Sequence, residues 1–125
     1  MRSSVLVAMA AAVTLAGAIS ASAAGPEGTW LTESGETKVK IAPCGGGLCG
    51  DIVWLQAPTP NAQVGTRLLT MSASGNGSWS GELFNYKDGK TYRGKLSLES
   101  ENRIKLSGCV LGGLICRSQT WTRTR

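Results

Sequence analysis

Four cysteines are the residues whose spacing points most directly to chemistry: Cys44, Cys49, Cys109 and Cys116. An even number of cysteines in an exported chain is typical of disulfide bonds. The alternative is a zinc site with four thiolate ligands, which usually takes closer pairs with two residues between them. Here the pairs are spaced more widely, and the chain contains no histidine. The pattern therefore predicts two disulfides and no metal site.

The residues of this chain give little support for general acid–base catalysis. Without histidine it lacks the commonest general base. Its carboxylates alternate with apolar residues or lie in turns, as solvated side chains do, and Glu82 and Asp88 merely flank a predicted hairpin. The glycine-rich stretches 45–47 and 75–78 lack the helix that a phosphate loop or a nucleophile elbow requires. We therefore expect no catalytic residue, no cofactor and no enzymatic activity.

The first 23 residues are typical of a secretory signal peptide. Arg2 precedes an uncharged apolar run over 5–19, and the small residues 21–23 resemble a cleavage site. The alternative, a membrane-spanning helix, needs about 20 apolar residues, and this run is shorter. We expect cleavage after residue 23, a periplasmic or secreted protein with no stable membrane insertion, and one domain over residues 24–125.

The basic residues are scattered rather than clustered, although the formal net charge is +5. Lys38 and Lys40 alternate along one predicted strand, and Arg93 and Lys95 along another. This spacing is typical of the solvated face of a strand. A weak attraction to anionic head groups remains open. We expect no nucleic-acid partner, and a monomer that binds a small apolar ligand or an envelope protein.

Short alternating runs, separated by Gly, Ser and Asn, predict an all-β domain. In 91–99, for example, Tyr92, Leu96 and Leu98 share one face and charged residues share the other. Eight such runs are predicted, at Thr29–Thr32, Thr37–Ala42, Gly50–Leu55, Thr66–Met71, Ser78–Phe84, Thr91–Glu99, Arg103–Cys109 and Arg117–Thr124.

Two motifs bracket the domain, Gly28-Thr29-Trp30 at its start and Trp121-Thr122-Arg123 at its end. Small closed antiparallel barrels use such a pair to join the first strand to the last. An even number of strands brings both motifs to the same end of an up-and-down barrel, whereas an odd number separates them by on the order of 20 Å. The motifs therefore favour eight strands, with 66–71 in the sheet and Trp30 and Arg123 as closure residues.

The eight-strand arrangement also separates the two cysteine loops. Cys44 and Cys49 flank the connection at the end that holds Trp30, and Cys109 and Cys116 flank one at the opposite end. Because the Cα atoms of a disulfide lie within about 7 Å of each other, this arrangement favours local pairs. Spacing alone does not exclude a cross-link, such as Cys44 with Cys109.

The order of motifs along the chain resembles the bacterial family called domain of unknown function 2147 (DUF2147). The resemblance implies a small exported protein with a lipocalin-like barrel and no settled activity. Its end motifs are similar to the lipocalin signature, in which a first-strand Trp packs under a last-strand Arg. Asp51 departs from the pattern, since a basic residue is expected there. The matching motifs are Gly28-x-Trp30, Cys44, Leu48-Cys49-Gly50, Ile52-Val53-Trp54-Leu55, Trp79-Ser80-Gly81, Asp88-Gly89-Lys90-Thr91-Tyr92-x-Gly94, Leu106-x-Gly108-Cys109 and Thr120-Trp121-x-Arg123.

Three aromatic residues, Trp54, Trp79 and Tyr92, share faces with aliphatic residues, so alternation predicts that they point into the barrel. They either fill the core or line a narrow apolar pocket, because an eight-stranded barrel holds side chains or one small ligand. The apolar loop after Cys109 could be a lid, a partner-binding patch or a membrane-touching tip. A pocket would open opposite Trp30, framed by Gln56–Gly65, Asn85–Lys90 and the loop with Val110, Leu111, Leu114 and Ile115.

The last strand leaves its orientation open, because neither of its faces is apolar. One face carries Trp121 together with Arg117 and Gln119, and the other carries serine and threonine. Two functions remain. The first is a carrier of a small hydrophobic or amphipathic ligand, and the second is a structural or interaction protein of the envelope with a filled barrel. A cavity of a few hundred Å³ would favour the carrier.

Overall fold

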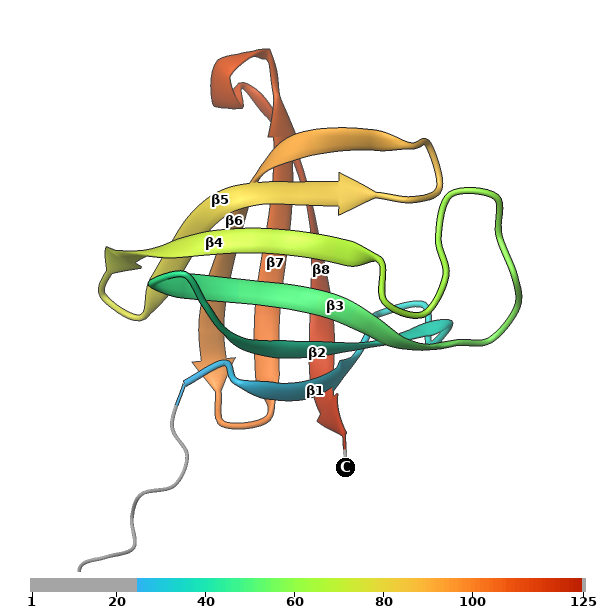
Figure 1. Ribbon diagram of the computed structural model, residues 1–125. Coiled ribbons are helices and arrows are strands. Elements are labelled where there is room, and N and C mark those ends of the chain that lie inside the picture. The colour runs from blue at the N-terminus through green and yellow to red at the C-terminus, as the bar shows by residue number, and fades with distance from the viewer. Residues whose placement is uncertain (1–24, 125) are drawn as a thin grey trace, which may run out of the picture.

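Eight antiparallel strands close into a barrel in the computed structural model, which describes residues 25–124 (Figure 1). Each strand pairs with its neighbours in sequence, and the first pairs with the last, so the expected up-and-down barrel is confirmed. The expected signal peptide, residues 1–23, lies outside the described residues. The strands are β1 (Gly28–Leu31), β2 (Thr37–Cys44), β3 (Gly47–Leu55), β4 (Arg67–Gly75), β5 (Ser78–Asn85), β6 (Lys90–Ser100), β7 (Arg103–Val110) and β8 (Ile115–Thr124), with a 3-10 turn, η2 (Leu111–Gly113), between β7 and β8.

The two ends of the barrel carry different parts of the chain. The chain enters β1 and leaves β8 at the same end, which also holds the turns β2–β3, β4–β5 and β6–β7. We call this the closed end. The opposite end holds the connections β1–β2, β3–β4, β5–β6 and β7–β8, and we call it the open end.

Trp30 and Arg123 join β1 to β8 near the closed end, where they lie opposite each other in the register. The guanidinium carbon of Arg123 lies 4.3 Å from the centroid of the Trp30 ring, a cation–π contact. Gly28 has a φ of 132°, and a Cβ there would lie 2.5 Å from an Arg123 nitrogen, so glycine is required. The guanidinium also donates hydrogen bonds of 2.6–3.0 Å to the carbonyl oxygens of Gly25, Glu27 and Glu101.

Buried side chains fill the barrel from the closed end to its middle. Burial of one large apolar side chain stabilises the fold by about 1.5–3 kcal/mol, so this packed layer is the main source of stability. Gly50 makes room for it, since a Cβ there would lie 2.7 Å from the Cγ of Leu69. The least accessible core residues are Trp30, Val39, Ile41, Ile52, Leu69, Met71, Leu96, Ile104 and Leu106.

A β-bulge in β3 corrects the expected orientation of Trp54. Lys38 pairs with Trp54, but the next residue of β2, Val39, pairs with Ile52, so Val53 is an extra residue in β3. A bulge of this kind shifts the alternation by one position. Ile52 points inward, whereas Val53 and Trp54 are 43% and 40% exposed. Trp54 therefore lies on the outer face, with the Lys38 ammonium 5.4 Å from its ring centroid.

Both disulfides form within their own hairpins, as the eight-strand arrangement predicts. Cys44 pairs with Cys49 at the closed end, with Cα atoms 5.7 Å apart. Cys109 pairs with Cys116 at the open end, with Cα atoms 4.0 Å apart. One covalent link therefore closes a hairpin at each end of the barrel.

Candidate ligand-binding cavity

The open half of the barrel contains a cavity of about 820 Å³. This volume is within the range of small-molecule sites, about 300–1,000 Å³. The cavity opens at the end opposite Trp30, as the sequence predicts for a pocket. Its lining includes residues 32–34, which were not expected there, and no residue of Gln56–Gly65, which was expected to frame the mouth. Its lining combines residues of five strands and two connections: Thr32, Glu33, Ser34, Leu68, Leu83, Phe84, Asn85, Tyr86, Lys87, Asp88, Tyr92, Leu106, Gly108, Val110, Ile115, Arg117, Ser118, Gln119 and Trp121.

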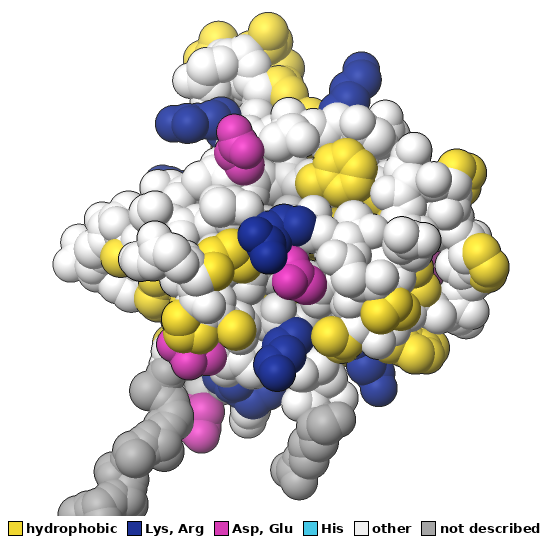
Figure 2. Space-filling view, viewed as in Figure 1, with side chains coloured by type: hydrophobic (Ala, Val, Ile, Leu, Met, Phe, Trp, Pro, Cys, Tyr) yellow, Lys and Arg dark blue, Asp and Glu magenta, His cyan; other side chains and the backbone are white. Residues whose placement is uncertain are grey.

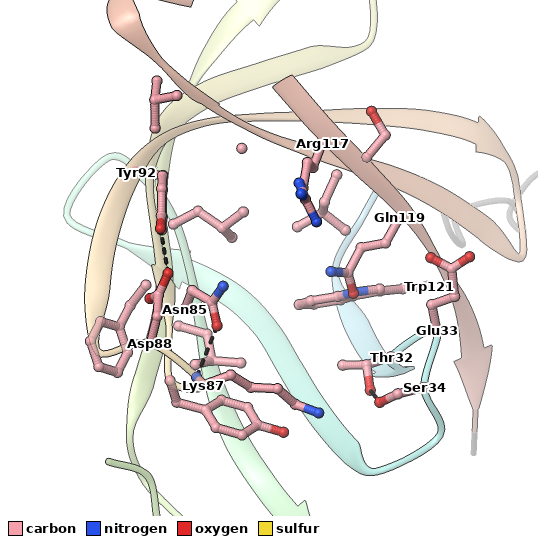
Figure 3. A pocket seen from close by; sticks show the side chains of 18 of the residues that line it. Thr32, Glu33, Ser34, Asn85, Lys87, Asp88, Tyr92, Arg117, Gln119 and Trp121 are labelled. Carbon is pink, nitrogen blue, oxygen red and sulfur yellow. Dashed lines mark hydrogen bonds between the residues drawn. The ribbon is translucent and has the colours of Figure 1, made fainter. Parts of the chain in front are cut away.

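The deep part of the cavity is apolar. Leu83 and Leu106 form its walls together with the ring of Trp121, which is only 4% exposed. The Nε1 of Trp121 donates a 2.6 Å hydrogen bond to the Oε1 of Gln119. Figure 3 shows the indole extending into the cavity beside the Gln119 side chain. The structure thus decides the orientation of β8, whose face with Arg117, Gln119 and Trp121 points inward.

The cavity exists because two strands leave space at this end. β1 is short, and its pairing with β8 ends at Leu31 opposite Thr122. Beyond that point a single hydrogen bond replaces the ladder, from the amide of Thr120 to the Glu33 carboxylate at 3.3 Å. On the other side of the cavity, Gly108 has no side chain. A Cβ there would make only ordinary contacts, at 3.6 and 3.7 Å.

Tyr92 and Asp88 form a hydrogen-bonded pair at the mouth (Figure 3). The Tyr92 hydroxyl donates to the Asp88 carboxylate, which also accepts a hydrogen bond from the amide of Lys90 at 2.9 Å. The bond from Tyr92 lowers the pKa of Asp88, and the same bond raises the pKa of Tyr92. At neutral pH the pair is therefore a carboxylate held by a phenol.

Arg117 brings a positive charge to the cavity. It lies on the inward face of β8, and Figure 3 shows its guanidinium directed into the cavity. Within residues 25–124 it forms no ion pair, whereas the other lysine or arginine of the lining, Lys87, contacts Glu36 at 2.8 Å. A guanidinium without a carboxylate partner can bind an anionic group through two parallel hydrogen bonds.

Three of the four connections around the mouth are tied to one another. Tyr86, after β5, shares a 2.6 Å hydrogen bond with the fully buried Thr37. The side-chain Nδ2 of Asn61, in the β3–β4 connection, donates a hydrogen bond to the Tyr86 carbonyl at 3.1 Å. The ion pair between Lys87 and Glu36 lowers the pKa of Glu36 and raises that of Lys87, mainly through its hydrogen bond. These contacts hold the β1–β2, β3–β4 and β5–β6 connections together on one side of the mouth.

The three aromatic residues expected to line a pocket do not come together. Tyr92 lines the cavity. Trp79 is half-buried against the core and lines a smaller hollow at the closed end, and Trp54 lies outside the barrel. Alternation alone leaves the orientation of Trp121 open, and nothing in the sequence singles out Arg117 and Gln119 as lining residues. Only the position of these three on one face of the last strand could have pointed to them.

Other kinds of site have little support in the part of the chain that is described. Within residues 25–124, no group of three or more His, Cys, Asp or Glu residues could hold a metal ion. The same residues contain no helix that is long and apolar enough to cross a membrane.

Comparisons with known proteins agree with this architecture. A family of uncharacterised proteins conserved in bacteria, DUF2147, matches residues 28–123. A solved structure, described as protein HP1028 from Helicobacter pylori and as belonging to the lipocalin family, superposes with a TM-score of 0.62. It is 18% identical in sequence, and the match covers 79% of this chain and 82% of that chain. No curated protein matches the chain.

Proposed function

This chain belongs to the DUF2147 family of uncharacterised bacterial proteins, and we propose that it is an exported, non-enzymatic binding module for a small amphipathic ligand. The observation that carries the proposal is the cavity of about 820 Å³ in the open half of the barrel. The similarity to a lipocalin-family structure agrees with a barrel of this kind.

The distribution of side chains in the cavity supports an amphipathic ligand. The apolar part would lie deep, against Leu83, Leu106 and the Trp121 ring. The polar part would lie near the mouth, where Arg117 forms no ion pair with any described residue and Tyr92 is held by Asp88. Because Arg117 is positively charged, a carboxylate or another acidic head group fits this position.

Export to the periplasm or the medium is part of the proposal and has two supports. The first 23 residues have the pattern of a cleavable signal, and both disulfides are of the kind that persists in an oxidising compartment. A non-enzymatic role is proposed because the cavity lining has no histidine or free cysteine. A monomer is expected.

The test is a search for bound ligand in the native protein. Protein expressed from the full-length sequence is purified without denaturation, and mass spectrometry analyses both its mass and the small molecules that it releases. Tryptophan fluorescence then follows the addition of fatty acids and the matching alcohols. We expect a released amphipath, and saturable binding in which an acid binds more tightly than the alcohol of equal length.

Two variants of β7 sharpen this test. Gly108→Leu places a side chain in the cavity, where the space around a Cβ permits it, and should weaken binding at least tenfold while the barrel still folds. Lys105→Leu adds the same side chain at an exposed, outward-facing position of β7 and should bind like the wild type. Equal binding by both variants, or no released or added ligand bound by the wild type, would favour the alternative of an envelope interaction protein.

A further inference from the structure

The end of the β7–β8 hairpin carries four of the seven large hydrophobic residues that are exposed in the described part of the chain. Val110, Leu111, Leu114 and Ile115, which we call the tip, are 38%, 68%, 84% and 54% exposed. Exposed apolar surface of this density marks an interaction site. We propose that the tip docks the protein onto an anionic lipid surface, with the mouth of the cavity facing the lipid.

The tip projects beyond the rest of the barrel. Figure 1 shows the β7–β8 hairpin extending past the neighbouring strands at the open end, and Figure 2 shows its hydrophobic side chains gathered at the summit. Within residues 25–124, no side-chain hydrogen bond or ion pair connects the tip to the other three connections of the mouth. The Cys109–Cys116 disulfide closes its base. The tip is thus held in shape without being covered.

The charges around the hairpin complement an anionic surface. No Asp or Glu follows Glu101 in the sequence, so the whole β7–β8 hairpin is free of negative side chains. Arg93 lies opposite Cys109 in the register, and Arg117 directly follows Cys116. By register the nearest acidic residue is Glu82, which lies on β5 opposite Arg93 and forms no ion pair with it. The other carboxylates nearby are held away from the tip, since Glu33 accepts a hydrogen bond from the backbone amide of Thr120 and Asp88 accepts one from Tyr92. Cations beside exposed aliphatic side chains are typical of segments that bind at the surface of anionic membranes.

The tip is also continuous with the cavity. Val110 and Ile115 belong both to the exposed tip and to the cavity lining. They lie opposite each other in the β7–β8 register, next to Arg117 on the inward face. Apolar side chains of the tip therefore reach the rim of the cavity. A lipid surface suits this geometry better than a protein partner, because an amphipathic molecule can pass from it into the cavity without crossing water.

Vesicle binding tests this proposal directly. The full-length sequence is expressed, the mass of the purified protein is recorded, and binding is measured by co-sedimentation. One set of vesicles contains phosphatidylcholine alone, and the other contains roughly 30% phosphatidylglycerol. We expect binding to the anionic vesicles that weakens as salt is added. The double variant Leu111→Ser/Leu114→Ser should bind at least about tenfold more weakly.

Matched controls separate the tip from general hydrophobicity and from the cavity. Val53→Ser/Val64→Ser removes two other exposed aliphatic side chains, on β3 and in the β3–β4 connection, and should bind vesicles within about twofold of the wild type. Arg93→Gln/Lys95→Gln should weaken binding to the anionic vesicles several-fold. Soluble-ligand binding by the tip variant should be unchanged, so loss of the cavity function would be recognised separately.

Three results would overturn the proposal. They are no binding of the wild type to either vesicle, equal binding by the tip variant and the wild type, and equal loss of binding in the Val53/Val64 control. Thermal unfolding of each variant establishes that a loss of binding does not come from a loss of folding.

Discussion

The closed and open ends of this barrel use the same hairpin architecture for opposite purposes. At the closed end, Trp30 is inaccessible and Arg123 joins three separate backbone segments by hydrogen bonds. At the open end, Trp121 is the last buried residue of β8, and the inward positions above it face a cavity. One end therefore supplies stability, and the other has space for a ligand.

A domain of this size can contain a cavity at one end because its other end is tightly packed. Stability is concentrated in a packed layer of buried side chains at one end, whereas each end has one hairpin closed by a disulfide. The connections at the other end are then held by a few polar contacts, such as Thr37 with Tyr86 and Glu36 with Lys87. These contacts position the mouth without filling it. Substitutions at the two ends should accordingly separate stability from binding.

The largest effect is expected at the centre of the closed end. Trp30→Ala should lower the free energy of unfolding by about 3–5 kcal/mol, because it removes a fully buried aromatic side chain. Trp54→Ala should lower the free energy of unfolding far less, since Trp54 is 40% exposed on the outer face. Denaturant unfolding of both variants measures the comparison. A similar loss for the two would contradict the outward orientation of Trp54.

A smaller effect is expected from the closure residue of β8. Arg123→Ala removes three hydrogen bonds to carbonyl oxygens and the contact with the Trp30 ring, so we expect a loss of about 2–3 kcal/mol. Arg123→Lys keeps the positive charge but should restore only part of the lost stability. An ammonium group cannot reproduce the planar set of N–H donors of a guanidinium. Chemical denaturation gives the values. Ligand affinity should stay unchanged, and a parallel loss of affinity would show that the two ends are coupled.

The smallest effect concerns the ion pair at the mouth and depends on pH. The pKa of Glu36 is lowered from its ordinary value of 4.5 by Lys87, so the pair contributes stability above that pH. The contribution is lost as the pH falls through the lowered pKa of the folded state. Lys87→Met should therefore lower the melting temperature slightly at pH 7, and the difference from the wild type should vanish in acid.

Calorimetry at several pH values measures this difference. A gap between wild type and Lys87→Met that persists unchanged below the pKa of Glu36 would mean that Lys87 acts through its packing and not through the ion pair. Glu36→Gln is the matched control, since it removes the same charge pair from the other side.

The sequence was sufficient for the parts of the fold that follow from local periodicity. Alternating residues locate the strands, and the even strand number that Trp30 and Arg123 favour assigns the cysteines to opposite ends. Periodicity fails at Trp54, because one extra residue in β3 inverts the alternation and both faces of that strand are apolar. No pattern in the residues marks the bulge.

The cavity was harder to predict than the barrel because it depends on packing between distant strands. The inward face of β8 carries Arg117, Gln119 and Trp121. Two of these side chains are polar, so the sequence does not identify this face as part of the core. The space above Trp121 arises from the early end of β1 and from the absent side chain at Gly108. Such features become visible only when the register across the barrel is known.

The most direct test of this account is to map ligand contacts along the barrel by NMR. Dodecanoate, which has an apolar chain and a carboxylate, is titrated into isotope-labelled protein. Shifted resonances should cluster at the open end, at residues such as Leu83, Tyr92, Leu106 and Arg117, whereas those of Trp30 and Ile41 should not move. Shifts centred on the closed end, or no shifts at saturating dodecanoate, would contradict this prediction.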